Sequence, residues 1–153
     1  MARYGKRLNP RWWANETTRS IFERRALEYF PDLHFTVTRG GCAYSALVDV
    51  PHYEARRVKL IFKLGRIRSA PYIVADGPTE SPHRYREYDG KSLCIWDPLD
   101  SPEARWVFED GLLELLGHIR VHLFKEAWWR DTGEWPGPEA PHPVLSADPE
   151  TAA

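Results

Sequence analysis

The sequence predicts one α+β domain with an N-terminal helix, a four-stranded antiparallel meander, a cysteine-containing loop and a C-terminal helix. Three patterns favour this fold class: an apolar stripe with helical spacing near the start, several β-prone segments separated by turn residues, and a second helical stripe towards the end. The 153 residues suffice for a single core. We expect the domain to span residues 1–143, followed by a flexible tail at 144–153.

The N-terminal helix is predicted by a capping signal and the stripe that follows it. In "LNPRWW", Asn9 can accept hydrogen bonds from open backbone amides, and Pro10 suits a first helical turn because its missing N–H costs nothing there. Pro31 is expected to end the helix. The apolar side chains with helical spacing are Phe22, Ala26, Tyr29 and Phe30.

Four strands are predicted in the middle of the chain. The segments "HFTVTR" and "AYSALVDV" flank Gly40 and Gly41, which indicates a hairpin. The third segment, "RRVKLIFKLG", alternates, so that one face of the strand is buried. The face expected to be buried carries Val58, Leu60, Phe62 and Leu64. "PYIVADGP" supplies a short fourth strand, ended by its turn residues.

A long irregular stretch is expected from Thr79 to Pro102, and loops of that length in a compact domain are usually functional or disordered. Its aromatic content favours order. Ser101 and Pro102 can begin a helical turn before the C-terminal helix, which continues towards Trp129. Apolar residues of that helix are Leu112, Leu116, Ile119 and Leu123, and two glycines, Gly111 and Gly117, could interrupt it.

Composition argues against several classes of protein. A formal net charge of -1 disfavours a general nucleic-acid binder, which needs a basic excess. No apolar run reaches the roughly 20 residues of a membrane span, and no signal peptide is evident, so we expect a cytoplasmic protein. Two cysteines are too few for a disulfide scaffold. No phosphate-binding loop is present, and no metal or organic cofactor is expected.

Cys94, in "YDGKSLCIW", has two possible interpretations. It could be an inert core thiol, since free cysteine is among the most buried residue types. It could instead be a nucleophile, because a loop between a strand and a helix can expose a side chain on a rigid scaffold. His83, in the same loop, could serve as its base or could be an ordered loop histidine. Sequence order leaves both questions open.

Other candidate residues have plausible structural roles as well. Glu114, His118 and His122 share one helix face and could ligate zinc, although this spacing is common on solvated helices. Cys42, beside the hairpin glycines, is expected to be structural. A basic set could meet an acidic partner or a nucleic acid, or could simply form a solvated sheet face. That set is Arg56, Arg57, Lys59, Lys63, Arg66 and Arg68.

Three tryptophans lie near the C-terminal end of the chain: Trp128, Trp129 and Trp135. Their default role is to cover a core. The rigid segment "WPGPEAPH" could also pack over the loop that carries Cys94, which would bring His142 near the thiol.

The order of these elements resembles the ubiquitin-conjugating-enzyme fold over roughly Pro10 to Trp129. Within it, "HRYREYDGKSLCIW" and "WWRDTGEWPGPEAPH" are similar to bacterial ubiquitin-conjugating-enzyme-like proteins, particularly those of type II CBASS antiphage defence systems. Pro71 resembles the family's proline near the last strand, and His83 the histidine of its His-Pro-Asn motif. Cys94 resembles its thioester cysteine, and Trp106 the tryptophan before its second helix.

The resemblance implies a transferase in which Cys94 forms a thioester with the C-terminus of a partner protein and passes it to an amine. The implied partner is a cGAS/DncV-like nucleotidyltransferase, and ATP would be consumed by a separate activating enzyme if the system has one. His83 would organise the loop and Tyr85 would assist it. Supporting positions would be Trp96, Trp106, Asp89 and His142.

One departure from the eukaryotic pattern concerns oxyanion stabilisation. Arg84 and Tyr85 follow His83 where Pro-Asn is usual, so the asparagine is missing, and Tyr85 or a backbone amide could replace it. Three alternatives stay open: a carrier for a bacterial ubiquitin-like protein, a noncatalytic partner-binding module of the same fold, and a cysteine hydrolase that uses Cys94 with His83.

Overall fold

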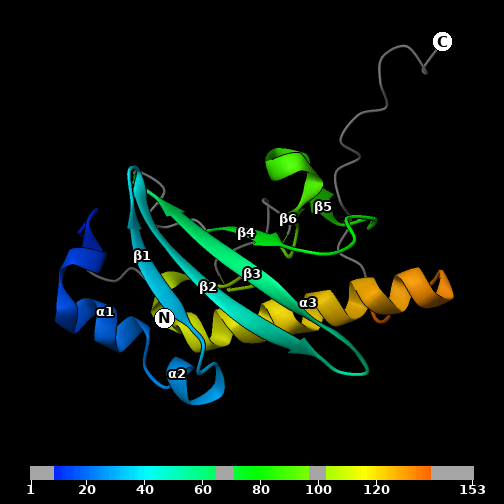
Figure 1. Ribbon diagram of the computed structural model, residues 1–153, viewed down its shortest axis with the longest axis horizontal. Coiled ribbons are helices and arrows are strands. Elements are labelled where there is room, and N and C mark those ends of the chain that lie inside the picture. Colours follow the sequence, from blue (N-terminus) through cyan, green and yellow to red (C-terminus); the bar gives the residue numbers. More distant parts are fainter. Residues whose placement is uncertain (1–8, 65–70, 97–102, 139–153) are drawn as a thin grey trace, which may run out of the picture.

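The computed structural model describes residues 9–64, 71–96 and 103–138. Figure 1 shows an antiparallel sheet with one long helix running across one of its faces. The elements, in chain order, are η1 (Trp12–Ala14), α1 (Glu16–Phe22), α2 (Ala26–Tyr29), β1 (His34–Thr38), β2 (Gly41–Val50), β3 (Tyr53–Lys63), β4 (Tyr72–Ala75), β5 (Arg84–Tyr85), η2 (Glu87–Gly90), β6 (Ser92–Leu93), η3 (Phe108–Asp110) and α3 (Leu112–Thr132).

The sheet confirms the mixed α+β class, but within the described residues it has six strands where four are predicted. Its order is β1-β2-β3-β4-β6-β5, with antiparallel pairing throughout. The first four strands are the predicted meander. The two extra strands are short and come from the stretch expected to be irregular, because η2 turns the chain back and lets Tyr85 pair with Ser92. Ser92 also pairs with Val74 of β4, which joins the small hairpin to the sheet.

The β2–β3 pair forms the centre of the sheet and supplies much of the core. Val58, Leu60 and Phe62 are buried on one face of β3, as predicted. Leu64 is 47 % exposed, contrary to the prediction, because β3 ends at Lys63 and the alternation ends with it. At the start of β2, Gly41 packs so closely on β3 that an added Cβ would lie 1.8 Å from the carbonyl oxygen of Phe62.

The N-terminal helix starts later than the sequence predicts. Asn9 accepts a hydrogen bond from the amide of Arg11 in a turn, and the helix cap is Asn15, whose side chain accepts from the amide of Thr18. The segment between them forms η1, because Trp12 is buried and packs edge-on against Phe22. The predicted single helix is also divided, since Arg25 adopts a left-handed φ of 64° between α1 and α2.

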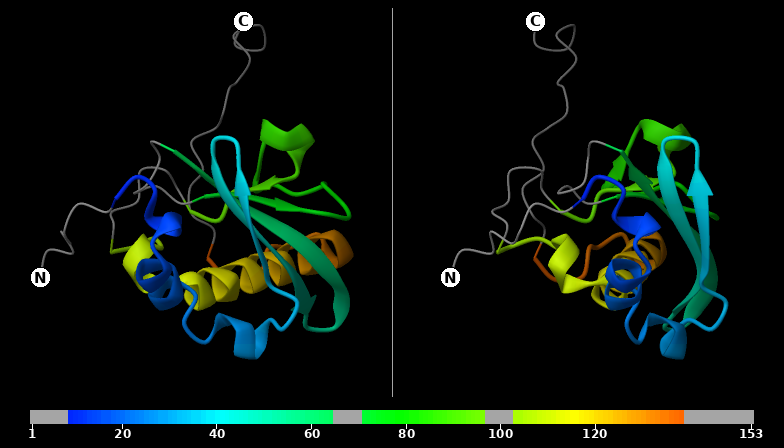
Figure 2. Two further views of the ribbon diagram at one scale, coloured as in Figure 1. Left: turned by 60° about the vertical axis from the view of Figure 1, so that its left-hand side comes forward. Right: turned by 90° about the vertical axis from the view of Figure 1, so that its left-hand side faces the viewer.

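Helix α3 packs against one face of the sheet, and the right-hand view of Figure 2 shows it beside the strands and nearly end-on. The four predicted apolar positions, Leu112, Leu116, Ile119 and Leu123, are all buried. Gly111 caps the helix and Gly117 lies inside it without interrupting it. The helical turn predicted at Ser101 and Pro102 lies outside the described residues.

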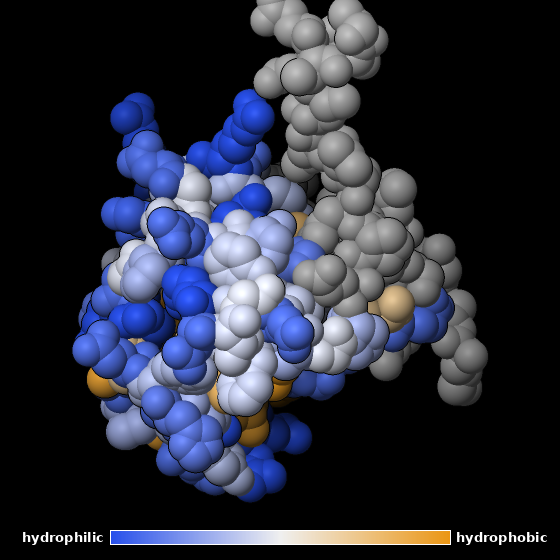
Figure 3. Space-filling view, turned by 90° about the vertical axis from the view of Figure 1, so that its right-hand side faces the viewer, coloured by the Kyte–Doolittle hydropathy of each residue, from blue (hydrophilic) through white to orange (hydrophobic). Residues whose placement is uncertain are grey.

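The end of the molecule shown in Figure 3 is mostly hydrophilic, with small apolar areas between charged side chains. Among the described residues, no helix combines the length and apolar character that crossing a membrane requires.

Candidate functional site

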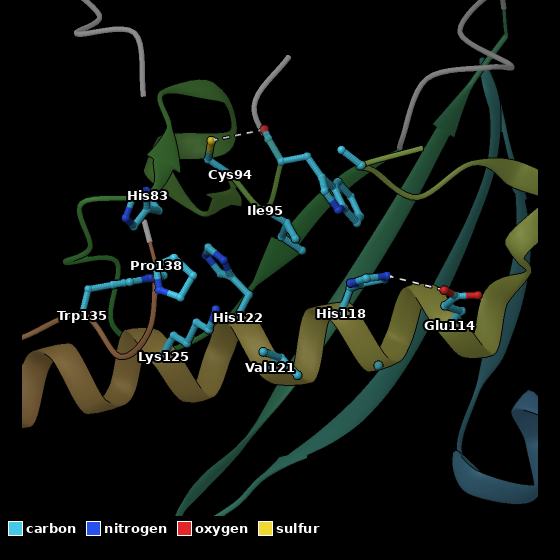
Figure 4. Close-up of a pocket in the computed structure, with 13 residues that line it drawn as sticks. His83, Cys94, Ile95, Glu114, His118, Val121, His122, Lys125, Trp135 and Pro138 are labelled. Carbon is cyan, nitrogen blue, oxygen red and sulfur yellow. Dashed lines mark hydrogen bonds and ion pairs between the residues drawn. The ribbon is translucent and has the colours of Figure 1, made fainter. Parts of the chain in front are cut away.

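A pocket of about 630 Å³ lies between the β5–β6 hairpin and α3, and both Cys94 and His83 line it (Figure 4). The hairpin side also contributes Ile95 and Trp96. The remaining lining residues are Ala104, Glu114, Gly117, His118, Val121, His122, Lys125, Trp135 and Pro138. The fold therefore brings Cys94 and His83, which lie outside α3, to one cavity. His118 and His122 of α3 line the same cavity.

Cys94 directly follows β6, and its backbone continues the pairing with β5. Its amide donates a hydrogen bond to the carbonyl oxygen of His83 at 3.0 Å. Its Sγ lies 3.8 Å from the carbonyl oxygen of Trp96. Cys94 is only 6 % exposed, which agrees with the buried one of its two interpretations. The physical reason is that β6 is an internal strand, so the residue after it starts inside the sheet, where Cys94 lines the pocket.

His83 is held at the other side of the hairpin. Its amide donates to Ser81 Oγ at 3.1 Å, and its ring, 5 % exposed, lies 4.2 Å from the ring of Trp135 between centroids. Trp135 and Pro138 both line the pocket, so the start of "WPGPEAPH" does pack beside the Cys94 loop. His142 lies outside the described residues.

Tyr85 meets the site through Trp96. The Tyr85 hydroxyl donates to the carbonyl oxygen of Trp96 at 3.4 Å, and this is the same oxygen that lies near Cys94 Sγ. The Trp96 ring packs edge-on against His118, with 5.5 Å between centroids. Trp96 thus connects β5, the cysteine and α3.

Two proposed supporting residues are not at the pocket. Trp106 is buried in the core, where its indole N–H donates to the carbonyl oxygen of Gly111 at 2.8 Å and fixes the start of α3. Asp89 is exposed in η2 with a left-handed φ of 58°, where it shapes the turn between β5 and β6. Neither lines the cavity.

The site also contains a buried ionic network that the sequence analysis did not identify. Glu126 of α3 is fully buried, and it accepts two hydrogen bonds from Arg84, at 2.6 Å from Nε to Oε2 and 2.7 Å from Nη2 to Oε1. His122 Nε2 lies 3.5 Å from Glu126 Oε2, within ion-pair distance but without the alignment of a hydrogen bond. The four-residue spacing of His122 and Glu126 was a visible signal, whereas Arg84 lies far away in sequence.

This network changes the acidity of Glu126. Burial raises the pKa of its carboxyl group, but the contacts with His122 and Arg84 outweigh burial and bring that pKa down from 4.5 to about 2. Glu126 is therefore an anion at neutral pH. Arg84 also donates to the carbonyl oxygens of Lys91 at 3.2 Å and Pro78 at 3.3 Å, so one guanidinium joins α3 to the segments that precede β6 and β5.

The zinc hypothesis receives no support from the geometry. His118 pairs with Glu114, 3.9 Å from Nε2 to Oε1, while His122 Nε2 faces Glu126. Throughout the described ranges, no three histidine, cysteine or carboxylate residues are grouped so as to hold a metal ion.

Cys42 is fully buried in β2, and burial raises the pKa of its thiol from 9.0 to about 12. Such a thiol is a poor nucleophile, which agrees with the predicted structural role.

The basic set is partly engaged in contacts within the chain. Arg56 pairs with Glu54 at 3.3 Å, and Arg57 pairs with Asp32 at 3.0 Å. Lys63 Nζ lies 5.1 Å from the centre of the Tyr72 ring. The last two members, Arg66 and Arg68, lie outside the described residues.

No protein-family model matches the sequence, and no curated protein matches it. The groups that line the cavity indicate which chemistry it can support. It presents one thiol, imidazole rings from two different elements and an aromatic wall, next to a buried anion that can orient an imidazole. This set of groups can accept an acyl group at sulfur and handle a proton beside it.

Proposed function

We propose that the protein is a ubiquitin-conjugating-enzyme-like acyl carrier, in which Cys94 accepts the C-terminus of a partner protein as a thioester and transfers it to an amine. The observation that carries this proposal is the pairing of Cys94 with His83. Their backbones are hydrogen-bonded across the β5–β6 hairpin, and both side chains line one pocket. The resemblance assigns the thioester to the first residue and the loop histidine to the second.

The arrangement of elements supports the same proposal. Pro71 directly precedes β4, the last strand of the four-stranded meander, and the hairpin with His83 and Cys94 follows. Trp106 then fixes the start of α3, which crosses the sheet. This is the order that the resemblance implies for a ubiquitin-conjugating-enzyme-like fold.

The chemistry requires little from the protein at the loading step. Exchange of an acyl group between two thiols is close to neutral in free energy, so the carrier mainly positions its cysteine. Sγ needs only an open side, which the pocket supplies. Tyr85 and Trp96 hold the loop around the thiol through the Trp96 carbonyl oxygen.

The proposed acyl donor is a cGAS/DncV-like nucleotidyltransferase in bacterial antiphage defence, activated by a separate ATP-consuming enzyme. A dedicated bacterial ubiquitin-like protein is the alternative donor for the same chemistry. Both donors present a C-terminal carboxyl group, so they are distinguished by offering each in turn to the same carrier.

The test is thioester formation with the activating enzyme and one donor at a time. On a nonreducing gel and by intact mass spectrometry, we expect an adduct that a thiol reductant removes. Cys94→Ala should abolish it and Cys42→Ala should retain it. Cys94→Ser should give a more stable oxyester, which identifies the bond as an acyl link to residue 94.

The small exposure of Cys94 favours one rival, a noncatalytic module of the same fold that only binds its partner. That rival predicts stable binding without any adduct. If the partner binds, the activating enzyme is active and no adduct forms, the carrier proposal is wrong and the binding module replaces it.

A further inference from the structure

We propose that His122, oriented by Glu126, is the general base that removes a proton from the acceptor amine as it attacks the thioester. This inference rests on the proposed function of Cys94. It adds a catalytic residue, His122, and a positioning residue, Glu126, that the resemblance does not assign.

His122 lies at the cavity that holds the proposed thioester cysteine. His122 lines the same pocket as Cys94, although it comes from α3 and the cysteine from the hairpin. Figure 4 shows its side chain rising from the helix towards His83. The ring centroids of His122 and His83 are 6.5 Å apart, and that of Trp135 is 5.6 Å from His122. An acceptor amine that enters this cavity towards Cys94 would meet the His122 ring in the same pocket.

The neighbouring carboxylate of Glu126 sets the orientation and the tautomer of the His122 ring. His122 is 5 % exposed, and its Nε2 is the one buried side-chain nitrogen or oxygen in the described part of the chain without a hydrogen-bond partner. Nε2 nevertheless faces the Glu126 carboxylate at 3.5 Å. A negative charge at that distance favours the tautomer with its proton on Nε2, because a lone pair there would face an anion. The lone pair is then on Nδ1.

The Glu126 carboxylate is itself held in place by a second partner, Arg84. Arg84 binds both oxygens of Glu126, so the carboxylate is fixed in direction as well as ionised. A buried carboxylate that orients an imidazole and stabilises its protonated form is the arrangement by which histidine acts as an efficient base. His122 therefore has both the partner and the location that this role requires.

The proposed step is balanced without any further reactant. The nitrogen lone pair of a neutral acceptor amine forms a bond to the thioester carbonyl carbon, and the carbon–sulfur bond breaks with its electron pair left on Cys94 Sγ. The proton lost by the nitrogen passes to His122 Nδ1. The imidazolium then returns that proton to the Cys94 thiolate, which restores both groups and leaves an amide product.

The test measures two steps separately: the loading of Cys94 with an acyl group, and the discharge of that acyl group to an amine. It needs no natural donor protein. The full chain is loaded at Cys94 from a synthetic peptide thioester, and the loss of the adduct is followed at neutral pH with free lysine or with hydroxylamine. Hydroxylamine is already neutral at this pH and is a strong nucleophile, so it depends little on a base. His122→Gln removes the basic nitrogen, and His122→Phe keeps an aromatic ring against Trp135.

We expect both variants to load like the wild type and to discharge to lysine about 10- to 100-fold more slowly, with hydroxylamine discharge nearly unchanged. His34→Gln is the matched control, because this histidine is exposed on β1 and does not line the pocket. It should discharge to lysine like the wild type.

Three results would overturn the inference, and they differ in what they leave standing. Equal discharge to lysine by the wild type and both variants would remove the base role and leave the carrier proposal intact. An equal loss with lysine and hydroxylamine would show a structural effect instead of proton transfer. A wild type that takes no acyl group at Cys94 from the peptide thioester would overturn the carrier proposal together with the inference.

Discussion

Arg84 and Glu126 form a bidentate ion pair that joins the cysteine hairpin to α3, with contacts of 2.6 and 2.7 Å. The side chains of both residues are almost completely buried. Removing two charges from water is costly, and a buried pair recovers that cost only when both partners are present and well oriented. The ion pair therefore fixes the β5–β6 hairpin on α3, and it stabilises the fold only when both residues are present.

Arg84→Met should lower the free energy of unfolding by about 3–5 kcal/mol, because it leaves the Glu126 carboxylate buried without its cation. Chemical denaturation monitored by tryptophan fluorescence measures the change. The double variant Arg84→Met with Glu126→Leu should be clearly more stable than Arg84→Met, since both buried charges are then absent. A double variant as unstable as the single one would contradict this account.

Acid should weaken the fold through the same carboxylate. The pKa of Glu126 is about 2 in the folded chain against an ordinary 4.5, so its contribution is fully present above about pH 4.5 and is lost as the pH falls towards 2. The contribution is on the order of 3 kcal/mol. Urea unfolding between pH 2 and pH 7 measures it. Glu126→Gln should show a flatter pH dependence than the wild type, and parallel curves would disprove the assignment.

The two cysteines should differ sharply in reactivity. Burial raises the pKa of Cys42 to about 12, so almost none of this thiol is ionised at pH 8. Cys94 has little exposed area but opens into the pocket. Iodoacetamide should therefore modify Cys94 in the native protein and Cys42 only after unfolding, as peptide mass spectrometry can show. Native modification of Cys42 in preference to Cys94 would contradict the assigned environments.

Gly41 should tolerate no side chain. An alanine Cβ there would lie 1.8 Å from the carbonyl oxygen of Phe62, so the β2–β3 pairing would have to shift. We expect Gly41→Ala to cost at least about 2 kcal/mol in thermal or chemical unfolding. The neighbouring Gly40→Ala is the control, because nothing lies within 4 Å of its added Cβ. Equal stability of the two variants would show that the strands approach less closely.

Local patterns predicted the larger elements well, and the reason is periodicity. Val58 and Leu60 alternate on β3, and Leu112 and Leu116 repeat on α3, so each segment indicates its own buried face. The helix start was misplaced because two asparagines precede apolar runs. Only packing of Trp12 in the core, which is not a local property, selects Asn15 as the cap in place of Asn9.

The candidate site was less predictable because it depends on contacts between distant segments. Cys94 and His83 were singled out as individual residues, but their backbone hydrogen bond requires the β5–β6 hairpin, and two-residue strands leave no periodic signal. The partnership of Arg84 with Glu126 is equally nonlocal. The low exposure of Cys94 follows from the position of β6 inside the sheet, which strand propensities do not specify.

The bond between Arg84 and Glu126 also has a consequence for how this sequence can change over time. Loss of either charge alone leaves the other buried without a partner. A substitution at position 84 or 126 is therefore selected against unless the other position changes with it. Related sequences should therefore show correlated changes at positions 84 and 126. Arginine with glutamate should recur as one combination and a pair of apolar residues as another, with mixed combinations rare.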